Sequence, residues 1–229
     1  IGLGIPAEPL FRSTFVGFHG GYNNIVYQIV GQPLGVFYLP HCTGLKPDGN
    51  GGYIYEVADL NGNGVNLEDG EDRYIAGQAV PKVLLGSNIS FRYKQFDLSL
   101  QINGAFGHKI YNGTSLSYMN MNSFPDYNVM ADAPRRNIKD QTATDYWLEK
   151  GDYVNFDYLT VGWTLPTSGK GLLKGLRLAF TVNNLGTITG YSGLTPMINS
   201  SQVGSTLGID DKRTYPLSRT YTLSLSINL

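Results

Sequence analysis

The sequence has little charge, a single cysteine and no long apolar run. Of its 229 residues, 17 are Lys or Arg and 18 are Asp or Glu, which gives a formal net charge of −1. No basic cluster stands out, so nucleic acid is not an expected partner. Cys42 has no second cysteine with which to form an internal disulfide. No stretch approaches the length of about 18 apolar residues that a transmembrane helix needs, which leaves a transmembrane β-barrel open.

Groupings of catalytic side chains are missing as well. The three histidines, His19, His41 and His108, are dispersed along the chain. No Ser–His–Asp set and no pair of carboxylates shows a defining spacing. We therefore do not expect an enzyme.

The most informative feature that is present lies at residues 219–229, RTYTLSLSINL. Tyr, Leu and Ile side chains fall on one face of an extended strand, and Thr, Ser and Asn fall on the other. Eleven residues is also about the length that a tilted strand needs to cross a bilayer. The small, uncharged polar face suits the wet lumen of a membrane barrel.

The same alternation recurs upstream. It is found in segments 85–93, 96–106, 159–165 and 176–184. Each match is weak by itself, but five in one chain indicate a pattern. High Gly and Tyr contents and only 15% charged residues agree with an all-β chain.

The connections between these strands alternate in length. Lys94 and Gln95 alone join segment 85–93 to segment 96–106, and the connection 166–174 is also short. The connections 31–82, 107–152 and 185–218 are long. Outer-membrane barrels have short periplasmic turns and long extracellular loops. We predict that residues 1–229 form the C-terminal part of a large antiparallel transmembrane β-barrel, with the three long segments as extracellular loops.

Several motifs occur together and in order. They are YKQFDLS at 93–99, DLNGNG at 59–64, GHKIYN at 107–112, GDY at 151–153, LTVGWTLP at 159–166, NNL at 183–185, TITGYSG at 187–193 and YP at 215–216. As a set, these motifs resemble those of the SusC/RagA-like TonB-dependent transporters of Bacteroidetes. The resemblance covers roughly residues 31–229.

This resemblance implies a function in nutrient import across the outer membrane of a Gram-negative bacterium. It implies a barrel of about 22 strands, a plug domain inside it, energy from TonB and a SusD-like surface lipoprotein as partner. Oligosaccharides or peptides are the implied substrates, and membrane lipid surrounds the wall. The plug and the TonB box are expected outside this chain, in the remainder of the same barrel protein.

One loop motif has the spacing of a cation site. Asp59, Asn61 and Asn63 occupy the first, third and fifth positions of an EF-hand-like loop, the Val65 carbonyl oxygen the seventh, and Asp69 lies close to the twelfth. Oxygen ligands at these positions would hold Ca²⁺ or Mg²⁺. The alternative is an Asx-rich turn in which these residues serve backbone geometry alone.

Aromatic residues of the long connections are candidates for substrate binding, because aromatic faces pack against the apolar faces of sugar rings. The candidates are Tyr111, Tyr118, Phe124, Tyr127, Tyr146, Trp147 and Tyr191. From these we select a predicted aromatic set of five: Tyr111, Tyr118, Tyr146, Trp147 and Tyr191. The alternative is that these rings pack the loops against one another.

A second architecture competes with the barrel. In a soluble glycan-binding β-sandwich with a structural Ca²⁺ loop, the apolar faces of the strands would pack together in a closed core. In a barrel wall, the same faces would be turned outward and the polar faces inward.

Overall fold

The computed structural model describes residues 11–15, 22–65, 72–165, 175–198, 207–212 and 215–228. The chain forms two compact units. The first, here called the loop unit, contains residues 1–81, 108–151 and 191–215; the second, the sheet unit, contains 82–107, 152–190 and 216–229. Each unit is therefore assembled from three separate segments of the sequence. In the part of the chain described here, no helix is long and apolar enough to cross a membrane.

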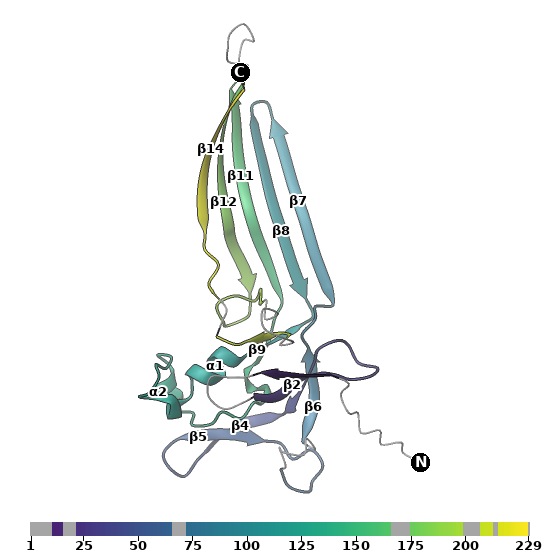
Figure 1. The fold of residues 1–229 in the computed structure, drawn as a ribbon, viewed down its shortest axis with the longest axis vertical. Coiled ribbons are helices and arrows are strands. Elements are labelled where there is room, and N and C mark those ends of the chain that lie inside the picture. Colours follow the sequence, from purple (N-terminus) through teal and green to yellow (C-terminus); the bar gives the residue numbers. More distant parts are fainter. Residues whose placement is uncertain are drawn as a thin grey trace. The chain divides into compact units, whose positions relative to one another are not determined.

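The described residues of the sheet unit form one antiparallel sheet of five long strands, all labelled in Figure 1. In spatial order the strands are β14 (Thr220–Asn228), β12 (Gly175–Thr189), β11 (Tyr153–Leu165), β8 (Phe96–Phe106) and β7 (Val83–Tyr93). All four pairings are antiparallel and join strands that follow one another within the unit. The five alternating segments of the sequence are thus confirmed as neighbouring strands of a meander.

The tightest connection of the sheet is the predicted two-residue turn between β7 and β8. Lys94 has a φ of 52°, in the left-handed region that two-residue hairpin turns require. The Gln95 carbonyl accepts a hydrogen bond of 2.8 Å from the backbone N–H of Thr164, which ties the turn to β11. The turn fixes the register in which Tyr93 faces Phe96.

A β-bulge changes the pattern of β11. The pairing of β11 with β8 shifts between Phe156 and Tyr158, so that Asp157 is an extra residue without a partner opposite it. Beyond the bulge, Val154 and Phe156 pair with Gly104 and Ile102, which belong to the apolar side of β8. The bulge therefore keeps apolar residues on one side along the whole strand.

The described residues of the loop unit form three smaller sheets and four short helical segments. Its strands are β1 (Phe11–Phe15), β2 (Tyr22–Gln28), β3 (Val36–Pro40) and β6 (Arg73–Gln78) in one sheet, β4 (Cys42–Pro47) and β5 (Tyr53–Val57) in another, and β10 (Leu148–Lys150), β9 (Lys109–Asn112) and β13 (Ile209–Asp210) in the third. Its helical segments are α1 (Gly113–Tyr118), η1 (Met121–Ser123), α2 (Ala133–Arg136) and η2 (Asp145–Trp147). Helices α1 and α2 and several of the strands are labelled in Figure 1. The long connections have regular structure, which the sequence does not predict.

One hydrophobic core joins the segments of the loop unit. Phe37 and Leu39 come from the first long connection, Tyr111 and Ile138 from the second, and Ile209 from the third, and all are almost completely buried. Burying one large apolar side chain stabilises a fold by roughly 1.5–3 kcal/mol. The three connections therefore fold together as a single body, not as independent loops.

Candidate functional site

The sheet unit carries a continuous apolar surface on one face. Because the strands are in register, apolar residues line up across all five of them, as in the row Phe91, Leu98, Val161, Phe180 and Leu223. A second row is formed by Tyr93, Phe96, Trp163, Leu178 and Leu225. These side chains do not form a closed core: Phe91 is 63% exposed and Leu223 is 71% exposed. An apolar surface of this extent marks contact with another apolar phase.

The opposite face of the same sheet is polar and internally hydrogen-bonded. Asn88 on β7 donates to the Gln101 side chain on β8 and to the Tyr158 hydroxyl on β11, both at 3.0 Å. The hydroxyls of Thr160 and Thr181 lie 2.9 Å apart. A wall with these two faces can separate hydrocarbon from a hydrated interior, because each face is complementary to one of the two phases.

The bulge in β11 adds a carboxylate to the polar face. Asp157 accepts hydrogen bonds from the side-chain amides of Asn103 and Asn155, and Asn155 in turn accepts one from the hydroxyl of Thr187. This network joins β8, β11 and β12 near the ends of the strands that lead into the long connections. The bulge thus re-aims a polar side chain while the apolar face stays unbroken.

The predicted cation loop shows the local geometry of turns. The Asp59 carboxylate accepts backbone N–H bonds from Gly62 at 2.6 Å and from Gly64 at 2.9 Å, and the Asn61 side chain accepts one from the Asn63 N–H. The bond from Gly64 is the main cause of the lowered pKa of Asp59. Val65 is exposed, and Asp69 lies outside the described residues.

No cluster of three or more His, Cys, Asp or Glu side chains that could hold a metal ion occurs in the described part of the chain. The hydrogen bonds of Asp59 are those of the Asx-turn alternative. The binding of Ca²⁺ or Mg²⁺ by this loop stays a prediction.

The predicted aromatic set falls into two groups. Tyr111, Trp147 and Tyr191 are buried in the loop unit. The indole N–H of Trp147 donates to the Tyr55 hydroxyl at 2.6 Å, and the Tyr191 hydroxyl donates to the Asp210 carboxylate at 2.7 Å. Burial, followed by repulsion from Asp210, raises the pKa of Tyr191 far above its ordinary value.

The remaining two aromatic residues are more accessible. Tyr146 is partly buried, with its ring centroid 5.3 Å from that of Tyr55 and 4.9 Å from that of Trp147. Tyr118, at the end of α1, is exposed. The geometry therefore favours packing as the role of the buried rings, and of the set, Tyr118 keeps an open face.

Cys42 lies in a setting that suppresses its reactivity. Its backbone N–H donates to Asp145, whose carboxylate also lies 2.7 Å from Nδ1 of His41 and accepts from the Tyr74 hydroxyl. Burial is the main cause that raises the pKa of the Cys42 thiol. A protonated thiol is a poor nucleophile, so this cluster holds the first long connection to the second and offers no catalytic centre.

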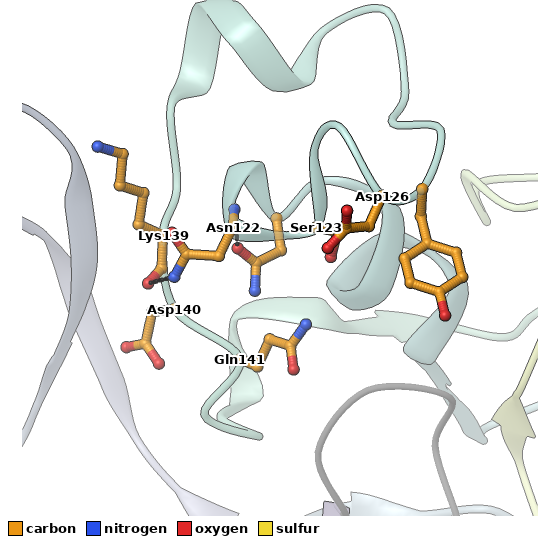
Figure 2. Close-up of a pocket in the computed structure, with 8 residues that line it drawn as sticks. Asn122, Ser123, Asp126, Lys139, Asp140 and Gln141 are labelled. Atoms are coloured by element: carbon orange, nitrogen blue, oxygen red, sulfur yellow. Dashed lines mark hydrogen bonds between the residues drawn. The ribbon is translucent and has the colours of Figure 1, made fainter.

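A polar cavity opens in the second long connection (Figure 2). It has a volume of about 360 Å³ and is lined by Asn120, Asn122, Ser123, Asp126, Tyr127, Lys139, Asp140 and Gln141. The lining comes from η1, from the turn that follows it and from segment 139–141. Of these residues the sequence pointed only to Tyr127, as one of the aromatic residues of the long connections, because isolated Asn, Asp and Gln in a long connection carry no distinguishing pattern.

Comparison with known proteins gives a consistent set of relatives. No family model matches the chain. It is 30% identical over 227 residues to the TonB-dependent receptor P3 of Formosa agariphila, covering 86% of this chain and 22% of that protein. It is also 30% identical over 192 residues to the TonB-dependent receptor SusC of Bacteroides thetaiotaomicron, covering 79% of this chain and 18% of SusC. The chain thus spans about a fifth of the length of these relatives.

Solved structures of similar fold include two states of one importer. The RagAB peptide importer in its closed-closed state matches with a TM-score of 0.67 and 19% identity over 89% of this chain and 24% of that chain. Its open-open state matches with a TM-score of 0.66 and 16% identity over 100% of this chain and 25% of that chain. At this identity the likeness establishes the fold, and that fold is part of an antiparallel β-barrel.

Proposed function

The chain belongs to the SusC/RagA-like family of TonB-dependent receptors, and we propose that it forms barrel wall and extracellular loops of an outer-membrane nutrient importer. The observation that carries this proposal is the two-sided sheet. Rows such as Phe91 to Leu223 present an exposed apolar surface, and Asn88, Gln101 and Tyr158 form a hydrogen-bonded network on the other face. The strands have 9 to 15 residues, enough to cross a bilayer at a tilt.

The same observation argues against the soluble sandwich. In a sandwich the apolar faces of two sheets pack against each other, so their side chains are buried. Leu225 and Ile227 are instead 61% and 56% exposed. Residues such as these are suited to hydrocarbon and would make an isolated sheet prone to aggregation.

In the complete importer, the loop unit lies outside the cell and contributes to the chamber in which substrate is held. The substrate is an oligosaccharide or a peptide, the partner is a SusD-like surface lipoprotein, and TonB acts on the plug to open the path. The common core of the three long connections supports this assignment, because a folded body holds binding side chains in place better than separate flexible loops do.

Uptake by living cells tests the proposal. The gene for the complete protein is deleted, and cells are given two labelled pools, one of neutral oligosaccharides and one of short peptides. We expect uptake of one pool to fall strongly, to return with the complete wild-type gene, and to stop when an uncoupler removes the proton gradient. Unchanged uptake of both pools in the deletion strain would contradict the proposal.

A tag on the complete receptor tests the partnership. Extraction with detergent should yield the receptor together with a lipoprotein of the SusD-like class, in equal amounts. A receptor that purifies alone under mild detergent conditions would contradict the lipoprotein partnership, while the proposal of a barrel wall would still stand.

A further inference from the structure

The cavity beside η1 has the chemistry of a carbohydrate site. Asn122, Ser123 and Gln141 each present a group that both donates and accepts hydrogen bonds, as sugar hydroxyls do. Asp126 adds an exposed carboxylate, which accepts from O–H donors. Tyr127, 42% exposed, adds the one aromatic ring of the lining. A lining this polar suits a ligand rich in hydroxyl groups.

The wall of the cavity is fixed in place before any ligand arrives. The Asn120 side chain caps η1 by accepting from the Asn122 N–H at 2.9 Å, and the Asn122 side chain donates to the Lys139 carbonyl at 3.0 Å. Asp140 accepts from the backbone N–H groups of Tyr55 and Thr142. Asp140 is thus committed to structure, and the preformed wall lowers the entropic cost of binding.

Two other lining side chains remain available for a ligand. In the described part of the chain, no hydrogen bond engages the side chain of Asp126 or that of Gln141. Figure 2 shows these two groups reaching toward the same open space. A ligand hydroxyl placed there can donate to the Asp126 carboxylate and exchange hydrogen bonds with the Gln141 amide.

Charge narrows the class of ligand. The lining holds two carboxylates, of Asp126 and Asp140, and a single cation, Lys139. The Lys139 ammonium points away from the cavity in Figure 2 and lies 3.4 Å from the Asn50 carbonyl oxygen. An anionic sugar or the carboxyl terminus of a peptide would meet uncompensated negative charge. A neutral saccharide meets matching hydroxyl and amide groups.

We propose that this cavity binds a neutral saccharide unit, with Asp126 and Gln141 as its principal polar contacts and Tyr127 as its stacking ring. Its volume of about 360 Å³ lies at the lower end of the range of roughly 300–1,000 Å³ for ligand pockets, enough for one end of a short oligosaccharide. The proposal rests on the proposed function and assigns a substrate class to it.

Direct binding to the complete receptor tests the site. The protein, purified in detergent with its lipoprotein partner, is applied to an array of neutral oligosaccharides, and the strongest ligand is titrated calorimetrically. We expect Asp126→Asn and Gln141→Ala each to raise Kd about tenfold or more, because each removes a hydrogen bond to the ligand. Asp132→Asn is the matched control: this exposed Asp of the same connection pairs with Arg135 at the surface, so its Kd should stay unchanged.

Three results would overturn the site: no neutral oligosaccharide on the array binds, the two cavity variants bind with wild-type Kd, or they weaken binding of a peptide instead. If Gln141→Ala fails to fold, Asp126→Asn still decides, because no described residue depends on the Asp126 side chain. The receptor could bind a saccharide, lose that binding in the two variants, and still support no uptake in cells. That combination would confirm the binding site and contradict the import function. The two proposals therefore fail separately.

Discussion

Arg177 on β12 forms a bidentate ion pair with Asp97 on β8, across the strand that lies between them. Its Nε donates to Oδ1 of Asp97 at 3.1 Å, and its Nη2 donates to Oδ2 at 2.6 Å. The two strands are not neighbours, because β11 separates them, and the pair passes directly over Gly162 of β11. A side chain at this position would occupy the space of the guanidinium and the carboxylate. A paired fork of this kind is geometrically specific, so it fixes three strands at once.

Gly162→Ala should therefore destabilise the barrel. A Cβ at Gly162 would overlap both partners of the ion pair and force them apart, at a cost of about 1–3 kcal/mol for the lost charged hydrogen bonds. Urea unfolding of the complete receptor in detergent measures this change. Gly186→Ala is the control, because nothing lies within 4 Å of a Cβ there, and its effect should stay within about 0.5 kcal/mol.

Arginine substitutions should separate the two faces of β14. Leu223 belongs to the apolar row, whereas its neighbour Thr222 pairs with Thr181 on the polar face. Arg in place of Leu223 should cost about 2–4 kcal/mol near the middle of the bilayer, and Arg in place of Thr222 much less. The folded fraction of receptor in liposomes, read from heat-dependent migration on gels, reports both. Equal losses of folded receptor in the two variants would mean that lipid does not contact one face of β14 in preference to the other.

Alkaline pH should lower the stability of the loop unit, because Tyr191 is buried in its neutral form. In the folded protein, burial and Asp210 raise the pKa of Tyr191, whereas in the unfolded chain the pKa of Tyr is about 10. The stability that depends on neutral Tyr191 is therefore fully present below that pH. It is lost as the pH rises further, because only the unfolded chain then releases the proton.

The Tyr191→Phe receptor should show a smaller loss of thermal stability between about pH 9.5 and 11 than wild type does. At neutral pH it should be less stable by about 1–3 kcal/mol, since the buried Asp210 loses a donor. Tyr215→Phe, at an 85% exposed position, is the control and should follow wild type at every pH. A parallel pH profile for Tyr191→Phe would show that another group controls the alkaline transition.

The long strands could be predicted because their faces are set by local alternation. Tyr221, Leu223 and Leu225 repeat every second residue, and the structure keeps that phase to the end of β14. The alternation does not predict the structure where pairing with a neighbouring strand decides which face a residue occupies. Asp157 shifts the phase of β11, and β12 continues to Thr189 through Asn184, whose φ of 51° interrupts the pattern. A single sequence does not show which partner imposes such a bulge.

The loop unit could not be predicted because its contacts are remote in sequence. Trp147 bonds to Tyr55, 92 residues away, and Ile138 bridges both Tyr53 and Asn120. The aromatic candidates were chosen for their ring chemistry, and burial then favours a packing role for three of the five. The polar residues of the cavity show no local pattern for the same reason, since only the fold brings segment 139–141 next to η1.

The orientation of the apolar face toward lipid is the central claim, and quenching by brominated lipid tests it most directly. The complete receptor, with Cys42 and every cysteine outside this chain replaced by Ser, carries a single fluorophore on Cys at position 223 or at position 222 and is reconstituted in liposomes. Brominated acyl chains should strongly quench the label that replaces Leu223 and leave the label that replaces Thr222 nearly unaffected. Equal quenching at both positions, or stronger quenching at position 222, would contradict the account.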